Sequence, residues 1–435
     1  METDKLLEIL NSANRYWSTG VLEAGITREA LGRCLRELER KEVLLLKGVR
    51  RSGKSTLMAQ MIRTLLEKKT NPRQILRVNL EEPLYASGYS LDLLERIYRV
   101  YREKVSPSGK CYLFLDEIQN IPGWERWVRG RGETENLKIV LTGSSSQLLS
   151  RETGAKLTGR QVSFEIFPLS FSEFLLFKGE TVKSKEDYFA RKPIIRNLLA
   201  EYRQYGGFPE VVLREEAEDK ELLLKQYFED ILYRDVVSRH KIRDILTLQN
   251  LAVFLLTNIG RLTSVTNLKR NFDVSQDKVE HYTSALLESY LVSRIPKFEM
   301  SLKKSLRARF KPYAIDTGLR NRVAFTFSED SGWLAENLVL HHLRQRHENI
   351  YYGSNGGEVD FLIKEGLRVA RSIRVWHADP SETQIPAREL APFAVHSRVA
   401  DSGESLLITN DLEQMEKVGK KEIRCLPLAV FLLGL

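Results

Sequence analysis

The stretch GVRRSGKST at residues 48–56 matches the pattern G-x-x-x-x-G-K-[ST] without a mismatch. It follows EVLLLK at residues 42–47, an apolar run typical of a buried parallel strand. After it, leucine, methionine and isoleucine recur at helical spacing from residue 57 to residue 66. A glycine-rich turn can match the pattern by chance, but a loop between a strand and a helix is what phosphate binding requires. The sequence therefore predicts a nucleoside triphosphate site.

The residues of this loop have separate expected roles. Glycines at both ends let the backbone curl so that several N–H groups point inward, and the next helix adds partial positive charge at its N-terminus. We expect Lys54 to reach the β and γ phosphates, and the Ser55 hydroxyl to bind the Mg²⁺ that bridges them. The predicted nucleotide-binding set in the loop is Gly48, Arg50, Arg51, Ser52, Gly53, Lys54, Ser55 and Thr56.

A second apolar run ends in two acids. CYLFL at residues 111–115 predicts a buried strand, and Asp116 and Glu117 follow it. A carboxylate that supports Mg²⁺ must lie at the carboxyl end of a strand beside the phosphate loop, so Asp116 is the predicted metal residue. Glu117 is expected to polarise the water that attacks the γ-phosphate. Strands often end in charged residues. Asp116 and Glu117 therefore indicate a catalytic role only in combination with the phosphate loop that precedes them in the chain. Together they predict an ATPase that uses ATP and Mg²⁺.

A third apolar run, at residues 137–141, ends in small hydroxyl residues. A polar side chain there would lie between the other two strand ends and contact the γ-phosphate or the water. Ser144 is our first choice for this role and Thr142 the second. A plain turn is the alternative interpretation.

Composition limits the broad class. The 435 residues correspond to about three domains of ordinary size, and a hydrophobic content of 42% is enough for real cores. No window approaches a membrane span, the first residues lack the layout of a signal peptide, and the three cysteines lie far apart. We therefore expect a cytoplasmic protein without membrane association. A net charge of +9 permits a polyanionic partner.

Several segments resemble prokaryotic AAA+ ATPases. These are the phosphate loop, LDEIQNIPGW at residues 115–124 and LTGSS at residues 141–145. FPLSFSEF at residues 167–174 is similar to the signature of the AAA-14 type, whose chains carry a C-terminal DUF4143-like domain. The resemblance covers nearly the whole chain. It implies an α/β fold, with an AAA+ P-loop core and a helical lid.

The resemblance also implies an assembly. In such ATPases the site forms between subunits, and an arginine just before the last core strand reaches the neighbour's γ-phosphate. Arg160 matches that position, which implies an arginine finger and a homo-oligomer, with a hexamer as the expected form. The alternative is a surface arginine or one that packs the lid.

A rigid turn interrupts the helical pattern that follows. YGGFPE at residues 205–210 carries paired glycines and a proline. It resembles an element of related signalling and archaeal ATPases in which the proline lies near the nucleotide, so Pro209 joins the predicted nucleotide-binding set. An ordinary helix break is the alternative.

Residues 241–312 show the pattern of a winged-helix domain, with three helices and a hairpin. The helix after Ser275 would be the recognition helix, but Asp277 and Glu280 make it a poor phosphate-binding element. The wing and its exit are more basic, and they form a candidate DNA-contacting ridge. A merely solvated run of charges is the alternative. The ridge consists of Lys297, Lys303, Lys304, Arg307, Arg309 and Lys311.

The last segment, residues 313–435, resembles the PD-(D/E)xK nuclease fold. Glu336, Glu358 and Asp360 match its acids, but Arg374 and Trp376 stand where active members carry an acid and a lysine. An arginine cannot ligate a cation and a tryptophan cannot act as a base. We therefore predict a nuclease-like α/β domain without nuclease activity. The apolar run at residues 426–435 predicts a buried strand.

These predictions combine into four domains, at residues 1–165 (AAA+ core), 166–240 (lid), 241–312 (winged helix) and 313–435 (nuclease-like). The expected function is an oligomeric, Mg²⁺-dependent ATPase that couples hydrolysis to rearrangement on DNA, with branched DNA as one candidate. The alternative is an ATP-switched signalling protein that recruits protein partners through its C-terminal domain.

Overall fold

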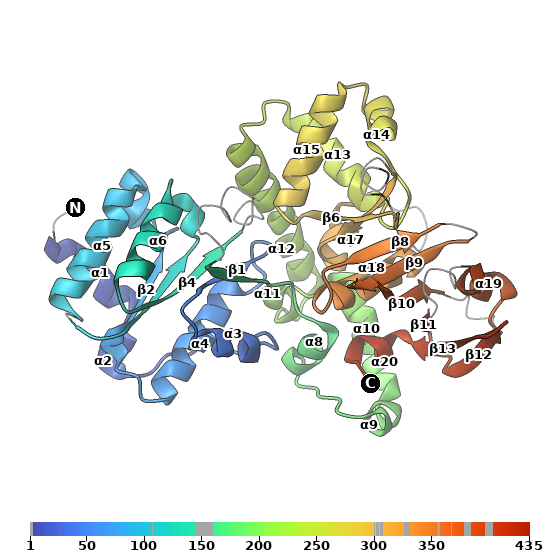
Figure 1. Cartoon of the computed structure of the whole chain (residues 1–435), viewed down its shortest axis with the longest axis horizontal. Helices are drawn as coiled ribbons and strands as arrows, with labels where there is room; N and C mark the ends of the chain where they lie inside the picture. The colour runs from blue at the N-terminus through green and yellow to red at the C-terminus, as the bar shows by residue number, and fades with distance from the viewer. Residues whose placement is uncertain are drawn as a thin grey trace. The chain divides into compact units, whose positions relative to one another are not determined.

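The computed structural model describes residues 3–106, 108–144, 160–299, 301, 304, 308–325, 331–354, 357–366, 368–377, 384–395 and 403–435. The chain divides into two compact units, Met1–Ile166 and Phe167–Leu435 (Figure 1). The predicted division of the second unit into a lid, a winged-helix domain and a nuclease-like domain stays a prediction. Among the described residues, no helix has the length and apolar character needed to cross a membrane.

The first unit is built on a parallel sheet with the strand order β2-β3-β4-β1-β5. Its strands are β1 (Val43–Lys47), β2 (Ile75–Asn79), β3 (Cys111–Asp116), β4 (Leu137–Gly143) and β5 (Gln161–Glu165). Its described α-helices are α1 (Thr3–Ala13), α2 (Tyr16–Thr19), α3 (Leu31–Glu37), α4 (Lys54–Glu67), α5 (Leu91–Lys104) and α6 (Trp124–Thr134). Short 3₁₀ turns are η1 (Pro72–Gln74), η2 (Pro83–Gly88) and η3 (Ile118–Asn120).

Helices cover both faces of this sheet (Figure 1). Side chains alternate along each strand, so each strand contributes side chains to both faces. In β1, Leu45 joins a core cluster with residues of α1, α5 and α6. Its neighbours Leu44 and Leu46 join a second cluster with residues of α3 and α4. Both faces of β1 are therefore buried, which explains its continuous apolar run. Since all the strands are parallel, their carboxyl ends meet at one edge of the sheet.

The second unit begins with helices. They are α8 (Phe171–Phe177), α9 (Lys185–Ala190), α10 (Lys192–Tyr205), α11 (Pro209–Val212), α12 (Ala217–Asp230), the π-helix η5 (Ile231–Ser238), α13 (Ile245–Thr257), α14 (Val265–Phe272) and α15 (Gln276–Glu288). Local sequence signals determine where several of these helices begin. Ser170 and Glu173 form a reciprocal capping box at α8. Strands β6 (Val292–Pro296) and β7 (Phe310–Ala314) form an antiparallel pair after α15.

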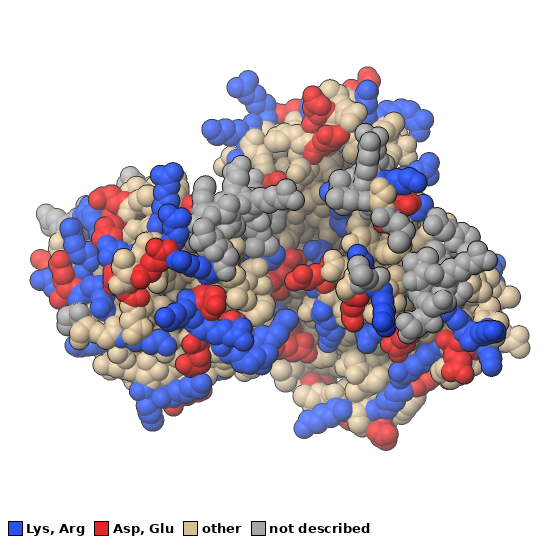
Figure 2. Space-filling view, in the orientation of Figure 1, with Lys and Arg blue, Asp and Glu red and all other residues tan. Residues whose placement is uncertain are grey.

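The remainder of this unit is a mixed sheet with helices. The strand order is β12-β13-β11-β10-β9-β8, and β8 is an edge strand. The strands are β8 (Ile350–Gly353), β9 (Val359–Glu365), β10 (Arg368–Val375), β11 (Glu404–Thr409), β12 (Gln414–Val418) and β13 (Lys421–Pro427). The helices are α17 (Thr317–Val323), α18 (Ser331–Arg344), α19 (Ala387–Val395) and α20 (Leu428–Leu433). On the visible face of each unit, Lys and Arg mix with Asp and Glu (Figure 2).

The end of the chain corrects one prediction. The run at residues 426–435 was expected to be a buried strand, but β13 ends at Pro427 and Leu428–Leu433 form helix α20. Those residues of the helix are mostly buried in the core of the second unit. A short apolar run buried on all sides has no periodicity that separates strand from helix, so the surroundings decide.

Candidate nucleotide-binding and catalytic site

The phosphate loop lies between the last residue of β1 and the first residue of α4. Gly48 has φ of 146°, and a Cβ atom there would lie 2.2 Å from the carbonyl oxygen of Ile166. Only glycine fits this close approach of two backbones. Gly53 has φ of 92° at the N-cap of α4, so the two glycines bend the loop as the sequence predicted.

Lys54 is buried and folds back over its own loop. Its Nζ donates hydrogen bonds to the carbonyl oxygens of Gly48, at 3.0 Å, and Val49, at 2.9 Å. The same nitrogen lies 3.9 Å from Oε1 of Glu117. A charged amine at this position needs oxygen partners, and loop carbonyls are partners that a phosphate can replace.

The rest of the loop fits a phosphate ligand. Within the described part of the chain, the Ser52 hydroxyl oxygen is buried without a hydrogen-bond partner. Burying a polar atom unpaired is costly, so a ligand that supplies a partner is favoured there. Ser55 and Thr56 lie in the first turn of α4, with Ser55 half-buried and Thr56 exposed. Arg50 pairs with Glu81 at 2.7 Å, and Arg51 is exposed.

The predicted acids lie at the carboxyl end of β3, and both are buried. Thr142 on β4 connects them. Its hydroxyl donates to Oδ1 of Asp116 and accepts the backbone N–H of Glu117 at 2.9 Å. Arg77 on β2 lies 3.6 Å from the other oxygen of Asp116. Side chains from β2 and β4 therefore hold Asp116 in place.

The surroundings of Glu117 favour its ionised form, although it lies inside the protein. Burial acts to raise its pKa, but Lys54, the amide of Gln119, Arg50 and the hydroxyl of Ser144 together hold the pKa below its usual value. An ionised carboxylate is the form that can accept a proton from water. Its backbone is left-handed, with φ of 56°, a conformation that non-glycine residues seldom adopt. Such an outlier is common at functional sites.

Both hydroxyl candidates contact the acids, Thr142 from within β4 and Ser144 from the position directly after it. Ser144, our first choice, interacts with Glu117 and accepts a hydrogen bond from Gln119 at 3.3 Å. Thr142, our second choice, bonds to Asp116. The role of either in contacting the γ-phosphate stays a prediction.

Gln119 is a site residue that sequence reasoning missed. Its amide nitrogen donates to Oε2 of Glu117 and to the hydroxyl of Ser144, and its own Oε1 is buried without a partner among the described residues. It lies in the short turn η3, directly after Glu117. Only its place two residues after a predicted catalytic acid could have drawn attention to it.

Arg160 lies at the opposite edge of the sheet. Its carbonyl oxygen accepts a hydrogen bond from the N–H of Val43, the first residue of β1, whereas the phosphate loop follows the last residue of that strand. A strand of five residues spans about 16 Å. The Arg160 side chain is 60% exposed and pairs with Glu133 of α6. It therefore lies away from the phosphate loop of its own chain.

Pro209 belongs to the second unit, where it is the first residue of α11. The turn before it is fixed by Asp316, the N-cap of α17, which accepts the N–H of Gly207 at 2.7 Å. A Cβ atom at Gly206, where φ is 75°, would lie 2.0 Å from the Asp316 carboxylate. The turn is thus packed on α17. A contact between Pro209 and a nucleotide stays a prediction.

The predicted basic ridge requires a correction. Lys297, Lys304 and Arg309 are exposed or half-buried, whereas Lys303 and Arg307 lie outside the described residues. Lys311 is fully buried, and its Nζ pairs with three carboxylates. The prediction that Lys311 contacts DNA was wrong, because this residue of β7 points into the core.

The partners of Lys311 are the three acids that resemble a nuclease site. The lysine nitrogen lies 3.0 Å from Glu336, 2.6 Å from Glu358 and 3.1 Å from Asp360. Burial and the nearby Asp360 carboxylate act to raise the pKa of Glu336, whereas Lys311 acts to lower it. Among the described residues, no group of three or more acidic, histidine or cysteine side chains is arranged to hold a metal ion. The absence of nuclease activity stays a prediction.

Comparisons with known proteins match both units. A family model described as an AAA domain (AAA_14) matches residues 40–175, and one described as a domain of unknown function (DUF8612) matches residues 196–330. The DUF4143-like identity of the C-terminal part stays a prediction. The uncharacterized protein MJ1544 of Methanocaldococcus jannaschii is 32% identical over 87% of this chain and 84% of its own. An uncharacterized Haemophilus influenzae protein is 29% identical over 74% of this chain and 80% of its own.

Solved structures show weaker likeness. The Orc1 protein of Aeropyrum pernix in complex with DNA has a TM-score of 0.34 and 14% identity, covering 68% of this chain and 92% of that one. AMPPCP-bound DnaA from Aquifex aeolicus has a TM-score of 0.26 and 12% identity, covering 60% and 86%. Likeness at this level extends to neither the sites nor the partners of those proteins.

Proposed function

The chain belongs to the family of AAA-domain proteins that includes MJ1544 of Methanocaldococcus jannaschii, and from this membership we propose that it is a Mg²⁺-dependent ATPase. One observation carries the proposal. An ionised, buried Glu117 lies 3.9 Å from the lysine of the phosphate loop, directly after an Asp116 that two neighbouring strands hold in place. This is the set of groups that positions a phosphate, a metal and a water.

The residues of the site have separate proposed roles. Lys54, Ser55 and the N–H groups of the loop would hold the phosphates, and Asp116 with Ser55 would hold Mg²⁺. Bound Mg²⁺ neutralises charge on the β and γ phosphates. When phosphate enters, Lys54 exchanges the carbonyls of Gly48 and Val49 for phosphate oxygens. Glu117 is then free to orient a water and accept its proton.

We further propose that the ATPase is a homo-oligomer, with a hexamer as the expected form. Arg160 lies at the amino edge of its sheet, far from the phosphate loop of its own chain. The same arginine, exposed at the surface, is suited to reach a neighbouring subunit's γ-phosphate. A second subunit would then complete each site.

The test of the ATPase is turnover with Mg²⁺ in three variants. Lys54→Ala should lose nucleotide binding, and Glu117→Gln should retain ATP but hydrolyse it at least about a hundredfold more slowly. Glu67→Gln, an exposed acid on α4, is the matched control and should match the wild type. Normal hydrolysis by Glu117→Gln would refute the catalytic assignment.

The proposed substrate of the coupled reaction is DNA, which the enzyme rearranges. Helices α13 to α15 followed by the β6-β7 pair support a winged-helix arrangement. The side chains at the start of α15 have protein partners. Lys278 pairs with Asp244 at 2.5 Å, and Gln276 bonds to Glu280. The exposed cations after β6 are therefore the better candidates for DNA contact.

ATP turnover with single-stranded, duplex and four-way-junction DNA over a salt series tests this role. Stimulation by one form that fades as salt rises supports a DNA-directed enzyme. If no form of DNA changes the rate of ATP turnover, the result would favour the alternative, an ATP-switched signalling protein that recruits partners through its C-terminal part.

A further inference from the structure

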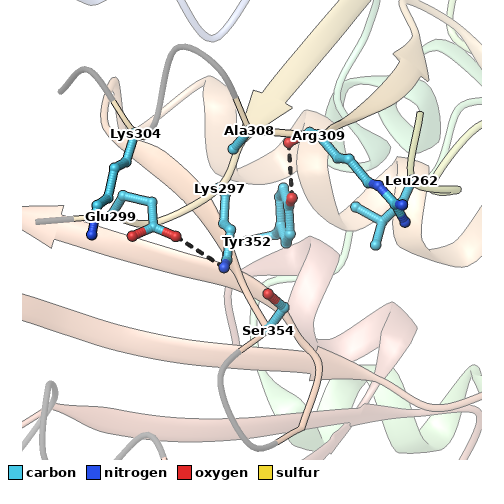
Figure 3. A pocket seen from close by; sticks show the side chains of 8 residues that line it. All are labelled: Leu262, Lys297, Glu299, Lys304, Ala308, Arg309, Tyr352 and Ser354. Atoms are coloured by element: carbon cyan, nitrogen blue, oxygen red, sulfur yellow. Dashed lines mark hydrogen bonds and ion pairs between the residues drawn. The ribbon is translucent and has the colours of Figure 1, made fainter. Parts of the chain in front are cut away.

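A pocket of about 690 Å³ lies in the second unit, beside the edge strand β8 (Figure 3). Its lining includes three cationic side chains and a single acid. The cations are Lys297, Lys304 and Arg309, and the acid is Glu299. The volume falls within the range of about 300–1,000 Å³ that is usual for ligand-binding pockets. Its lining is positively charged, because the cations outnumber the acid.

The charges have different partners. Lys297 pairs with Glu299 at 2.9 Å, which fixes one cation and neutralises the acid. Lys304 and Arg309 are exposed, and within the described ranges neither makes an ion pair. In Figure 3 these two side chains lie on opposite sides of the hollow. Two separated cations are suited to successive phosphates of one strand more than to a single phosphate ion.

The framework of the pocket is well fixed. Phe298 donates its N–H to the carbonyl oxygen of Tyr352 at 2.8 Å, so the chain after β6 is held against β8. The buried Tyr352 donates its hydroxyl hydrogen to the carbonyl oxygen of Arg309 at 2.8 Å. These bonds fix the backbone at Phe298 and at Arg309, one of the two cations. A preformed site loses less conformational entropy when it binds.

The lining also includes apolar surface. Leu262 contributes to the pocket and is 38% exposed. Sites for single strands combine a positively charged groove along the backbone with side chains against which the bases pack, most often aromatic rings. A concave hollow encloses one extended strand, whereas a duplex presents a convex face. The pocket is therefore better suited to a single strand.

We propose that this pocket binds the phosphate backbone of a single strand of DNA, with Lys304 and Arg309 on successive phosphates. The proposal rests on the proposed DNA-directed function and adds the site and the form of DNA. Lys297 is expected to hold Glu299 away from the entering phosphates.

Fluorescence anisotropy with labelled oligo-dT over a salt series tests the pocket. The variant Lys304→Ala/Arg309→Ala should bind oligo-dT at least about tenfold more weakly. The slope of log K against log salt should fall by about 1.4, since each single-strand phosphate contact contributes about 0.7. The matched control is Lys417→Ala/Lys420→Ala, which removes the same charge from exposed positions on and beside β12 and should bind as the wild type does.

Several results would overturn the proposal. They are equal weakening in the control variant, a larger loss for duplex DNA than for oligo-dT, and tighter wild-type binding of oligo-rU than of oligo-dT. Absence of oligo-dT binding by the wild type would also overturn it. Basal ATP turnover, measured without DNA in the same proteins, separates the two proposals. Lost DNA binding with normal turnover supports the pocket, and absent turnover with pocket-dependent DNA binding refutes only the ATPase.

Discussion

Gln119 donates a hydrogen bond to the carboxylate of Glu117, two residues before it, and its own Oε1 is buried without a partner among the described residues. The same amide nitrogen reaches the hydroxyl of Ser144, directly after the neighbouring strand β4. Gln119 therefore fixes the orientation of the proposed general base and leaves one acceptor beside it. An acceptor at this place is suited to the attacking water.

Gln119→Ala is expected to lower kcat about tenfold with little change in KM. The amide favours the ionised carboxylate, so its loss should raise the pKa of Glu117. The acidic limb of the pH–kcat profile should then move to higher pH. Asn120→Ala, the next residue in the same turn, is the control. A lower kcat with an unmoved acidic limb would contradict the positioning role and leave only a structural one.

Arg160 is testable by mixing subunits. Arg160→Ala and Lys54→Ala should each be nearly inactive alone. Arg160→Ala lacks the proposed arginine finger, and Lys54→Ala does not bind the nucleotide. In a mixture, a Lys54→Ala subunit presents an intact Arg160 to the intact phosphate loop of its neighbour. Turnover should therefore recover in part. Arg126→Ala, an exposed arginine on α6, should stay active alone. A mixture that stays as inactive as its components would exclude action between subunits.

Lys311→Met should destabilise the second unit by about 3–5 kcal/mol, because three carboxylates lose their buried partner. Urea unfolding followed by tryptophan fluorescence measures the loss. Adding Glu336→Gln and Asp360→Asn to Lys311→Met should restore part of the stability by removing the charges. Lys304→Met, at an exposed position, is the control. Wild-type stability in Lys311→Met would contradict the ion cluster as a structural element.

Asp316 should make stability depend on pH. Burial raises its pKa from 3.8 to about 6, although backbone N–H groups of Gly207, Leu319 and Gly318 act to lower it. Between these two values the folded protein keeps a proton that the unfolded chain has released. Stability should therefore fall as pH rises from about 4 to about 6, by about 3 kcal/mol in total.

Asp316→Asn cannot ionise, so its unfolding free energy should lose that slope between about pH 4 and 6. Asp277→Asn, an exposed acid on α15, is the control and should keep it. Urea unfolding at a series of pH values measures both. An unchanged slope in Asp316→Asn would assign the pH dependence to other groups.

The edge of the first unit that carries the proposed catalytic residues was largely predictable. Strand β1, the phosphate loop and the start of α4 are continuous in sequence, and Asp116 and Glu117 directly follow an apolar strand. Parallel strands bring their carboxyl ends together, so adjacency in space followed from the fold class. Gln119 escaped prediction because its contact depends on how a short turn folds back toward Ser144.

The basic ridge shows the opposite case. Charge along residues 297–311 was visible, but the face on which each residue lies was not. Lys311 lies within β7, whose five residues are all buried, whereas Arg309 precedes the strand and stays at the surface.

The sequence by itself determined the phosphate loop, its flanking strand and helix, and the two acids, because these depend on backbone geometry and periodicity within short segments. The tertiary structure alone decided three things: the contact of Gln119 with Glu117, the burial of Lys311 among three acids, and the pocket beside β8. The last two depend on register between segments far apart in the chain, which the packing of the whole unit sets. The contact of Gln119 with Glu117 is local, but it depends on how the turn η3 folds beside Ser144.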